Sequence, residues 1–191
     1  MPNALGHMRR CDALRLLRRG GGGHQEPHPP KCLIRKPYPA NLLTVPSCEE
    51  CNNSSSEDEE YFRLVMVGLL CHTDEAELLF DGPISRSMDR NSNIEELMFG
   101  ALRGADKTVI LDVDYPRIIR IAEKIARGLE FITTGVPFPV DQQFEIDFAE
   151  VEGTSSVAPY GSDFTCRRLA EEQGRWEFTL FESVRFVVEP A

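Results

Sequence analysis

The most regular pattern of hydrophobic and polar positions follows Pro116. Apolar residues recur there at helical spacing: Ile118, Ile119, Ile121, Ala122, Ile125, Ala126 and Leu129. Proline is common at the first position of a helix, and Gly135 and Pro137 follow the last turn. The pattern therefore predicts one long amphipathic helix from Pro116 to just before Gly135.

Two further helices are predicted in the middle of the chain. A run of serines, 54–56, precedes four acidic residues, 57–60. A serine can cap free amide groups, and acids are favourable at the positive end of the helix dipole. This helix is expected to continue to Leu70. Ser92 and Glu95 have capping-box spacing and predict a second helix over 92–103.

Strand patterns lie around and after the long helix. Residues 108–113 are rich in β-branched side chains, and residues 144–148 alternate between apolar and acidic side chains. Residues 176–181 and 184–188 predict two more strands. We therefore expect an α+β protein whose C-terminal half has helices followed by an antiparallel sheet.

The charge of the chain is unevenly distributed. The formal net charge is -10, but residues 1–56 carry eight Lys or Arg against four Asp or Glu, which leaves -14 for residues 57–191. A basic module on an acidic body suits contact with DNA, although a charged tail without a partner has the same composition. We place the boundary between a basic N-terminal module, 1–56, and an acidic domain, 57–191, at this change of charge.

The same N-terminal part contains segments that predict loops. Four glycines, 20–23, and a proline-rich run, 27–39, disfavour regular structure. The basic stretch 9–19 could contact phosphates through charge, or it could be a frayed tail. No apolar run reaches the roughly 18 residues of a membrane span, and the N-terminus lacks the apolar core of a secretory signal. We therefore expect a cytoplasmic protein that does not bind membranes.

Cys48 and Cys51 form the sharpest local motif. Two cysteines separated by two residues on a tight turn can present both thiolates to one tetrahedral Zn²⁺. Cys11 begins a similar spacing, but Leu14 stands where its partner would be. The candidates for a fourth ligand are His24, His28 and Cys32. A redox pair and incidental thiols are alternatives, although the pair does not lie between a strand and a helix as thioredoxin-like motifs do.

The residues around this pair resemble the HNH endonuclease family of ββα-metal proteins. The matching positions are Glu26, Pro29-Pro30-Lys31-Cys32-Leu33, Asn41-Leu42, Pro46, Cys48, Cys51-Asn52-Asn53 and Glu59-Glu60-Tyr61-Phe62. The resemblance implies a small zinc-stabilised ββα module that hydrolyses DNA phosphodiesters. In such proteins a histidine activates water, and a divalent ion such as Mg²⁺ stabilises charge on the phosphate.

The resemblance assigns roles to several residues. Asn41 would orient the catalytic histidine, Asn52 would contact the catalytic metal, and structural Zn²⁺ would be held by Cys11, Cys48 and Cys51. The position of the general-base histidine is occupied by Pro27, and His28 follows one residue later. Because a one-residue shift on a strand turns a side chain to the other face, His28 could act as the base only if the loop rearranges.

These residues can also be interpreted without assuming the resemblance to HNH endonucleases. A histidine in a proline-rich loop is expected to face solvent, and Asn41 would then be a turn residue before a strand. The departures at Leu14 and Pro27 both fall within residues 12–27. We hypothesise that this stretch is either locally decayed or read through a compensating frame error in the gene.

Three functions follow from these alternatives. The first is a metal-dependent HNH-type endonuclease whose activity Pro27 puts in question. The second is a zinc-stabilised binding or interaction protein without catalysis, which Pro27 favours. The third is an interaction protein without zinc. The acidic domain has no glycine-rich phosphate loop and no metal-spaced histidines, so we expect it to serve as a recognition or scaffold domain.

Overall fold

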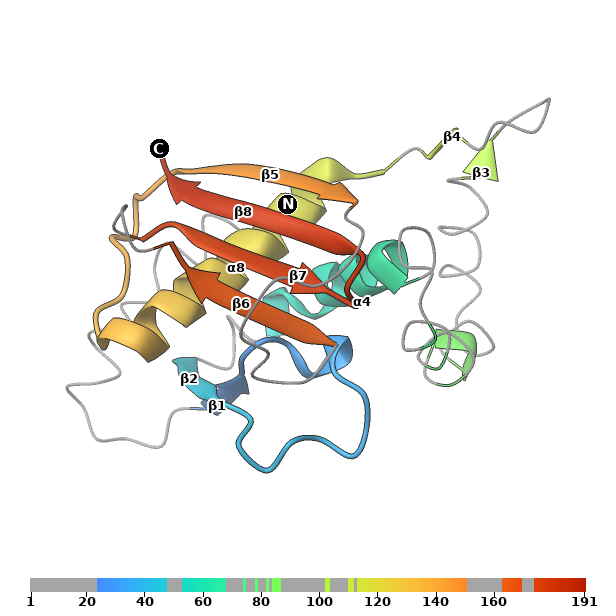
Figure 1. The fold of residues 1–191 in the computed structure, drawn as a ribbon, viewed down its shortest axis with the longest axis horizontal. Coiled ribbons are helices and arrows are strands. Elements are labelled where there is room, and N and C mark those ends of the chain that lie inside the picture. The colour runs from blue at the N-terminus through green and yellow to red at the C-terminus, as the bar shows by residue number, and fades with distance from the viewer. Residues whose placement is uncertain are drawn as a thin grey trace.

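The computed structural model describes residues 24–47, 53–67, 113–150, 163–169 and 174–191, with short pieces at 74, 78, 82, 84–86, 102–103 and 110–111. Helices and strands are both present, and every strand pair in these segments is antiparallel. The expected α+β class is therefore confirmed. Figure 1 shows the arrangement of the elements.

A four-stranded antiparallel sheet forms the larger layer of the fold. Its strands are β5 (Phe144–Glu150), β6 (Phe164–Arg168), β7 (Trp176–Leu180) and β8 (Val184–Pro190), in the order β5-β8-β7-β6. Strands β5, β7 and β8 confirm the predictions from alternation. Strand β6 was not predicted, because two of its five residues are arginines and its apolar pattern is short.

The long helix α8 (Tyr115–Thr134) lies across one face of this sheet (Figure 1). It begins within one residue of the predicted start, with Asp114 as the N-cap. Gly135 ends it in the left-handed region, with φ of 72°. Glycine adopts this conformation without steric cost, so the sequence stops the helix where the pattern of apolar residues ends.

A second helix, α4 (Ser56–Val65), packs against α8. Its acidic first turn matches the predicted start, whereas residues 68–70 of the predicted helix lie outside the described chain. Asp58 on α4 accepts hydrogen bonds from Arg117 Nε and Arg120 Nε on α8, at 2.7 and 2.6 Å. Burial of Asp58 opposes ionisation, but these two guanidinium groups hold the pKa of its carboxyl below the usual value.

The N-terminal part forms a small hairpin. Strand β1 (His24–Pro27) pairs with β2 (Thr44–Ser47), and the 3-10 turn η1 (Lys31–Leu33) lies in the connection between them. Strand β2 confirms the predicted extended approach to Cys48. The cysteine pair therefore follows a strand and precedes α4 in the sequence, so the expectation that set it apart from thioredoxin-like motifs is wrong. The order β1, β2, α4 along the chain is β-β-α.

One predicted helix is partly corrected. Residues 92–101 lie outside the described chain, but Leu102 and Arg103, the last residues of the predicted helix, form strand β3 (Leu102–Arg103). They pair with β4 (Ile110–Leu111), which falls inside the predicted strand 108–113. Hydrogen bonding to the next strand, β4, therefore outweighs the helical pattern at this end.

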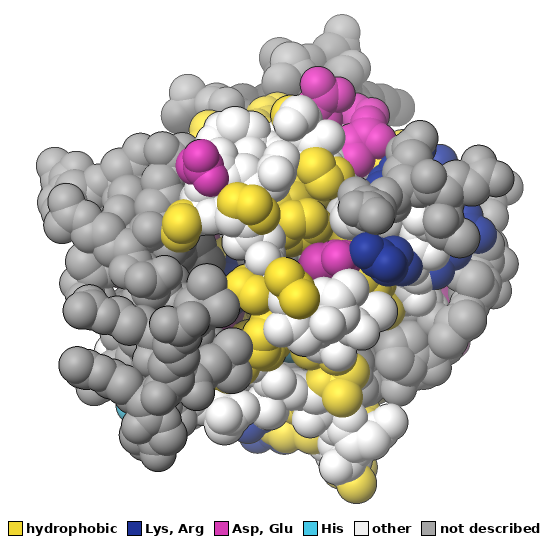
Figure 2. Space-filling view, turned by 90° about the vertical axis from the view of Figure 1, so that its left-hand side faces the viewer, with side chains coloured by type: hydrophobic (Ala, Val, Ile, Leu, Met, Phe, Trp, Pro, Cys, Tyr) yellow, Lys and Arg dark blue, Asp and Glu magenta, His cyan; other side chains and the backbone are white. Residues whose placement is uncertain are grey.

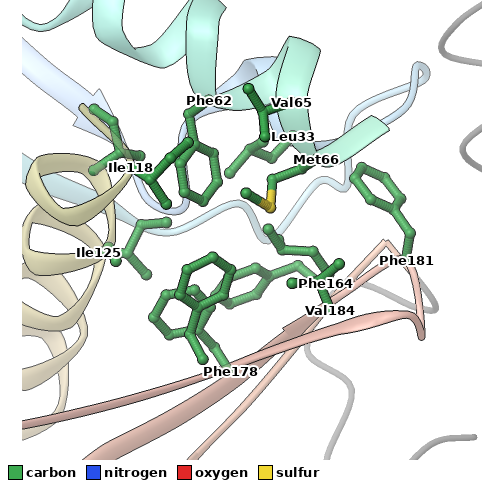
Figure 3. Close-up of a cluster of buried hydrophobic side chains, with 14 of the residues drawn as sticks. Leu33, Phe62, Val65, Met66, Ile118, Ile125, Phe164, Phe178, Phe181 and Val184 are labelled. Carbon is green, nitrogen blue, oxygen red and sulfur yellow. The ribbon is translucent and has the colours of Figure 1, made fainter. Parts of the chain in front are cut away.

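The hydrophobic core lies between the helices and the sheet. Figure 3 shows side chains from η1, α4, α8 and the sheet pointing toward one another, among them Leu33, Phe62, Ile125 and Phe178. Leu33 and Ile34 belong to the same buried cluster as the residues after position 56. The boundary at residues 56 and 57 stays a prediction, but the described residues on its two sides share one core.

Some apolar side chains remain on the surface. Hydrophobic side chains gather in the middle of the face shown in Figure 2, and Val136 and Val140 are among the exposed apolar residues after α8. Within the described part of the chain, no helix has the length and apolar character needed to cross a bilayer.

Candidate functional site

Burial alternates from Glu26 to His28, at the centre of the segment that resembles the HNH motif. Glu26 and His28 are both buried, whereas Pro27 between them is partly exposed. Successive strand residues point to opposite faces, so Pro27 occupies the outer face and His28 the inner one. The predicted change of face between these two positions is therefore present. His28 is not the solvent-facing loop residue expected without the family, because its exposed fraction is 1%.

His28 packs directly on helix α8. Its Nε2–H donates to the carbonyl oxygen of Ile125 at 2.7 Å, which makes the ring a neutral Nε2–H tautomer. The ring also lies over Gly128: a Cβ placed on that glycine would be 2.2 Å from Cε1. Glycine inside a helix costs about 1 kcal/mol relative to alanine, and here it makes room for the imidazole.

Burial controls the protonation of this histidine. It lowers the pKa of His28 from 6.5 to about 4, because a charged imidazolium would lose its hydration inside the fold. The Ile125 carbonyl and the Glu26 carboxylate favour the charged form, and the Lys124 ammonium disfavours it, but burial outweighs them. At neutral pH His28 is therefore an uncharged part of the interior.

A buried ionic cluster lies beside His28 and joins three elements. Lys124 on α8 is 6% exposed and forms an ion pair with Glu26 on β1. Its Nζ also donates to Glu59 Oε1 at 2.5 Å and to Ser55 Oγ at 2.6 Å, both from the start of α4. Burial disfavours the ammonium, but Glu59 and Glu26 more than offset it and raise the pKa of Lys124.

Ser55 illustrates how this cluster changes a local prediction. It is the N-cap of α4, yet its side chain forms no hydrogen bond to the free amides of the helix. The hydroxyl instead accepts from Lys124 and donates to Glu59 Oε1 at 3.3 Å. The predicted capping role for a serine is therefore wrong at this residue, because the buried ammonium competes for the same oxygen.

Cys32 is partly buried and packs against the hydrophobic core. Its thiol is 3.8 Å from the backbone oxygen of Glu59, to which it donates. Burial, followed by the negative charge of Glu59, raises the pKa of Cys32 to about 12.

The structure brings together only part of the predicted site. Asn41 lies in an exposed turn before β2, in keeping with the interpretation as a turn residue, whereas His28 is enclosed. The metal-binding candidates Cys11, Cys48 and Cys51 and the catalytic candidate Asn52 lie outside the described residues. Within the described ranges, no three His, Cys, Asp or Glu side chains converge as a metal site would require.

His24 has a different position from the other two candidates for a fourth zinc ligand. It is exposed at the start of β1 and lies directly opposite Ser47, the residue before Cys48. Cross-strand neighbours have Cβ atoms about 5 Å apart, so His24 lies at the end of the hairpin where the cysteine pair follows. Among the three candidates His24 is exposed, Cys32 is partly buried and His28 is buried.

Several residues of this cluster were not identified from the sequence. In the sequence, Lys124 has the pattern of an ordinary polar position on an amphipathic helix. No neighbouring residue indicates that its side chain is buried. Gly128 offers a signal, because a glycine inside the clearest helix of the chain requires a packing reason. A glycine at this position indicates that another side chain packs closely against the helix there, but the sequence does not show which side chain it is.

No protein-family model matches this chain, and comparison with curated proteins and with solved structures finds no match. The likeness to HNH endonucleases therefore rests on the residues between 26 and 62.

Proposed function

We propose that this chain is a zinc-stabilised, non-catalytic DNA-binding protein with an HNH-like N-terminal module. The observation that carries the proposal is the position of the histidine. Pro27 occupies the outer face of β1, where the resemblance would place the general base, and the imidazole of His28 is inside the core.

A general base has to reach the proton that it removes. Its nitrogen must come within hydrogen-bond distance of the attacking water and accept a proton near neutral pH. His28 is 1% exposed, its Nε2 is bonded to Ile125, and its pKa of about 4 makes it a weak base. Proline offers no proton acceptor in its side chain. These properties favour binding without hydrolysis.

The arrangement of elements supports the HNH-like architecture. Strands β1 and β2 form an antiparallel hairpin, α4 follows, and the Cys48 and Cys51 pair lies in the sequence between β2 and α4. This order is the one that the resemblance implies for a ββα-metal module. Structural Zn²⁺ on these cysteines would stabilise the junction between the hairpin and the helix.

The zinc ligands we propose are Cys11, Cys48, Cys51 and His24. His24 is included because it is exposed opposite Ser47, whereas His28 is buried and Cys32 is partly buried with its thiol directed to the Glu59 carbonyl. A divalent catalytic ion such as Mg²⁺ is not part of the proposal, since the enclosed His28 and the exposed Asn41 do not suit one site.

The charge of the N-terminal part supports DNA as the partner. Residues 1–56 carry a net charge of +4 on a chain of net charge -10. Basic side chains bind the phosphate backbone by releasing its counterions, and this binding weakens as salt rises. The acidic remainder would repel DNA, so contact is expected through the N-terminal module.

The proposal is tested by binding, cleavage and metal content in one preparation. We expect the purified full chain to contain one zinc, to bind DNA at low salt, and to leave supercoiled plasmid intact with Mg²⁺ or Mn²⁺. Cys48→Ser should abolish zinc binding, and His24→Ala should weaken it, whereas Cys166→Ser is the matched control on β6. Plasmid nicking that disappears in Asn41→Ala would show that the chain is a nuclease and overturn the proposal.

A further inference from the structure

The connection between β1 and β2 is positively charged on an acidic protein. Residues 31–43 include Lys31, Arg35 and Lys36 and contain no Asp or Glu. The chain as a whole has a net charge of -10. A local concentration of one sign of charge attracts ligands of the opposite sign even when the whole molecule repels them.

This connection is held firmly on the fold. Leu33 and Ile34 are buried in the core. Arg35 follows them, and its backbone N–H and side-chain Nε donate to the two oxygens of Asp163 at 2.9 and 2.6 Å. The anchoring has two consequences. The Asp163 carboxylate neutralises the charge of Arg35. The hydrogen bonds to Asp163 also fix the position of the backbone from which residues 36–43 continue.

The two remaining cations both lie over an exposed aromatic ring. The Nζ atoms of Lys31 and Lys36 are 5.4 and 5.6 Å from the ring centroid of Tyr38. Tyr38 is 37% exposed, and both lysines are exposed. Within the described part of the chain, no carboxylate forms an ion pair with either lysine.

We propose that Lys31, Lys36 and Tyr38 form a contact site for single-stranded nucleic acid. An unpaired base displaces the ammonium groups from the Tyr38 ring and stacks on it, and the two flexible lysine side chains then bind the phosphates on either side of the base. Proteins that bind single strands combine these two features, an aromatic stacking surface and nearby positive charge. In a duplex the base faces are covered by their neighbours, so the tyrosine would contribute little there. The inference rests on the proposed function and names the surface that carries it.

The test measures binding of a fluorescein-labelled oligothymidylate to the full chain by fluorescence anisotropy over a range of salt concentrations. Tyr38→Ala should weaken binding about tenfold, because it removes one stacked base, whereas Tyr38→Phe keeps the ring and should bind within about twofold of the unmodified chain. Lys31→Gln combined with Lys36→Gln should reduce the slope of log K against log salt by about 1.4, the value for two phosphate contacts on a single strand.

Two control variants lie elsewhere on the surface. Tyr115→Ala removes an exposed aromatic ring at the start of α8, and Arg185→Gln removes an exposed cation on β8. Neither should change the affinity by more than about twofold. An oligouridylate probe distinguishes RNA from DNA as the source of the strand, and tighter binding to either supports the site.

The outcomes separate this inference from the proposed function. Binding that is unchanged by Tyr38→Ala, or that prefers a duplex of the same length, overturns the contact site while DNA binding itself stands. No binding of any nucleic acid at low salt overturns both the contact site and the proposed function.

Discussion

A histidine ring and a glycine meet where the N-terminal hairpin contacts α8. His28 donates to the Ile125 carbonyl and lies over Gly128, whose missing side chain leaves the space that the ring fills. The two residues are a hundred positions apart in the sequence, and each of them alone would lower the stability of the fold. A buried polar ring needs a hydrogen-bond partner, and a glycine weakens the helix. Together they form one close contact.

The protonation of His28 should make stability depend on pH. The unfolded histidine has a pKa of 6.5 and the folded one a pKa of about 4, so the unfolded state binds the extra proton between these values. Its contribution to the free energy of unfolding is complete above pH 6.5 and is lost as the pH falls toward 4, a loss of about 3 kcal/mol. Urea unfolding at several pH values measures it. His28→Asn should unfold with a flatter pH profile in this window.

The pairing of His28 with Gly128 is testable by a double-mutant cycle. Gly128→Ala alone should lower the free energy of unfolding by about 1 to 3 kcal/mol, because the added methyl group overlaps the imidazole. In a His28→Ala background the same change should be neutral or stabilising by about 1 kcal/mol, since alanine is the better helix former. The same destabilisation in both backgrounds would mean that the ring does not occupy this space.

At the scale of elements, Lys124 connects the hairpin, α4 and α8. It is enclosed with Glu26 and Glu59, so removing the ammonium leaves two carboxylates without their cation. We expect Lys124→Gln to lower the free energy of unfolding by about 3 to 5 kcal/mol. The control is Arg175→Gln, whose ion pair with Glu189 is about one third exposed and should contribute at most about 1 kcal/mol. Similar losses in the two variants would argue against a buried ionic connection.

The hairpin between β7 and β8 contains a strained turn. Three residues, Phe181 to Ser183, join the two strands, and Phe181 and Glu182 both have positive φ, 50° and 56°. The hydrogen bond from Ser183 N to Leu180 O closes the turn. Phe181 is fully buried, so its side chain fixes the turn. Residues other than glycine lose about 1 to 2 kcal/mol in this conformation. Glu182→Gly should therefore raise the free energy of unfolding by up to about 1 kcal/mol, measured by urea denaturation, whereas Ser183→Gly should not.

The elements differ in how far the sequence predicts them. Helix α8 and strands β5, β7 and β8 follow from patterns within a few residues, and they were predicted with nearly correct bounds. Strands β3 and β6 pair with the next strand along the chain, but they are short and β6 contains two arginines, so periodicity misses them. Lys124 was missed because its partners lie on β1 and α4, far from it in the sequence. The face of His28 was predictable from alternation, but its contact with Gly128 was not.

At the scale of the whole molecule, the hairpin and the sheet domain share one interior. Leu33 and Ile34 join the apolar cluster of α4, α8 and the sheet, while His28 and Glu26 bring polar groups to α8. The basic N-terminal part therefore has a fixed orientation on the acidic part at β1 and η1. A binding surface on the β1–β2 connection would be presented by the whole fold.

The central claim is that His28 is a neutral residue of the interior and not a base exposed to substrate. NMR titration of the imidazole nitrogens tests this most directly, with the His28 signals assigned by their loss in His28→Asn. We expect a neutral ring protonated at Nε2 whose pKa lies near 4. A ring that titrates near 6.5 and takes up protons as an exposed histidine does would contradict the claim and return His28 to the candidates for catalysis.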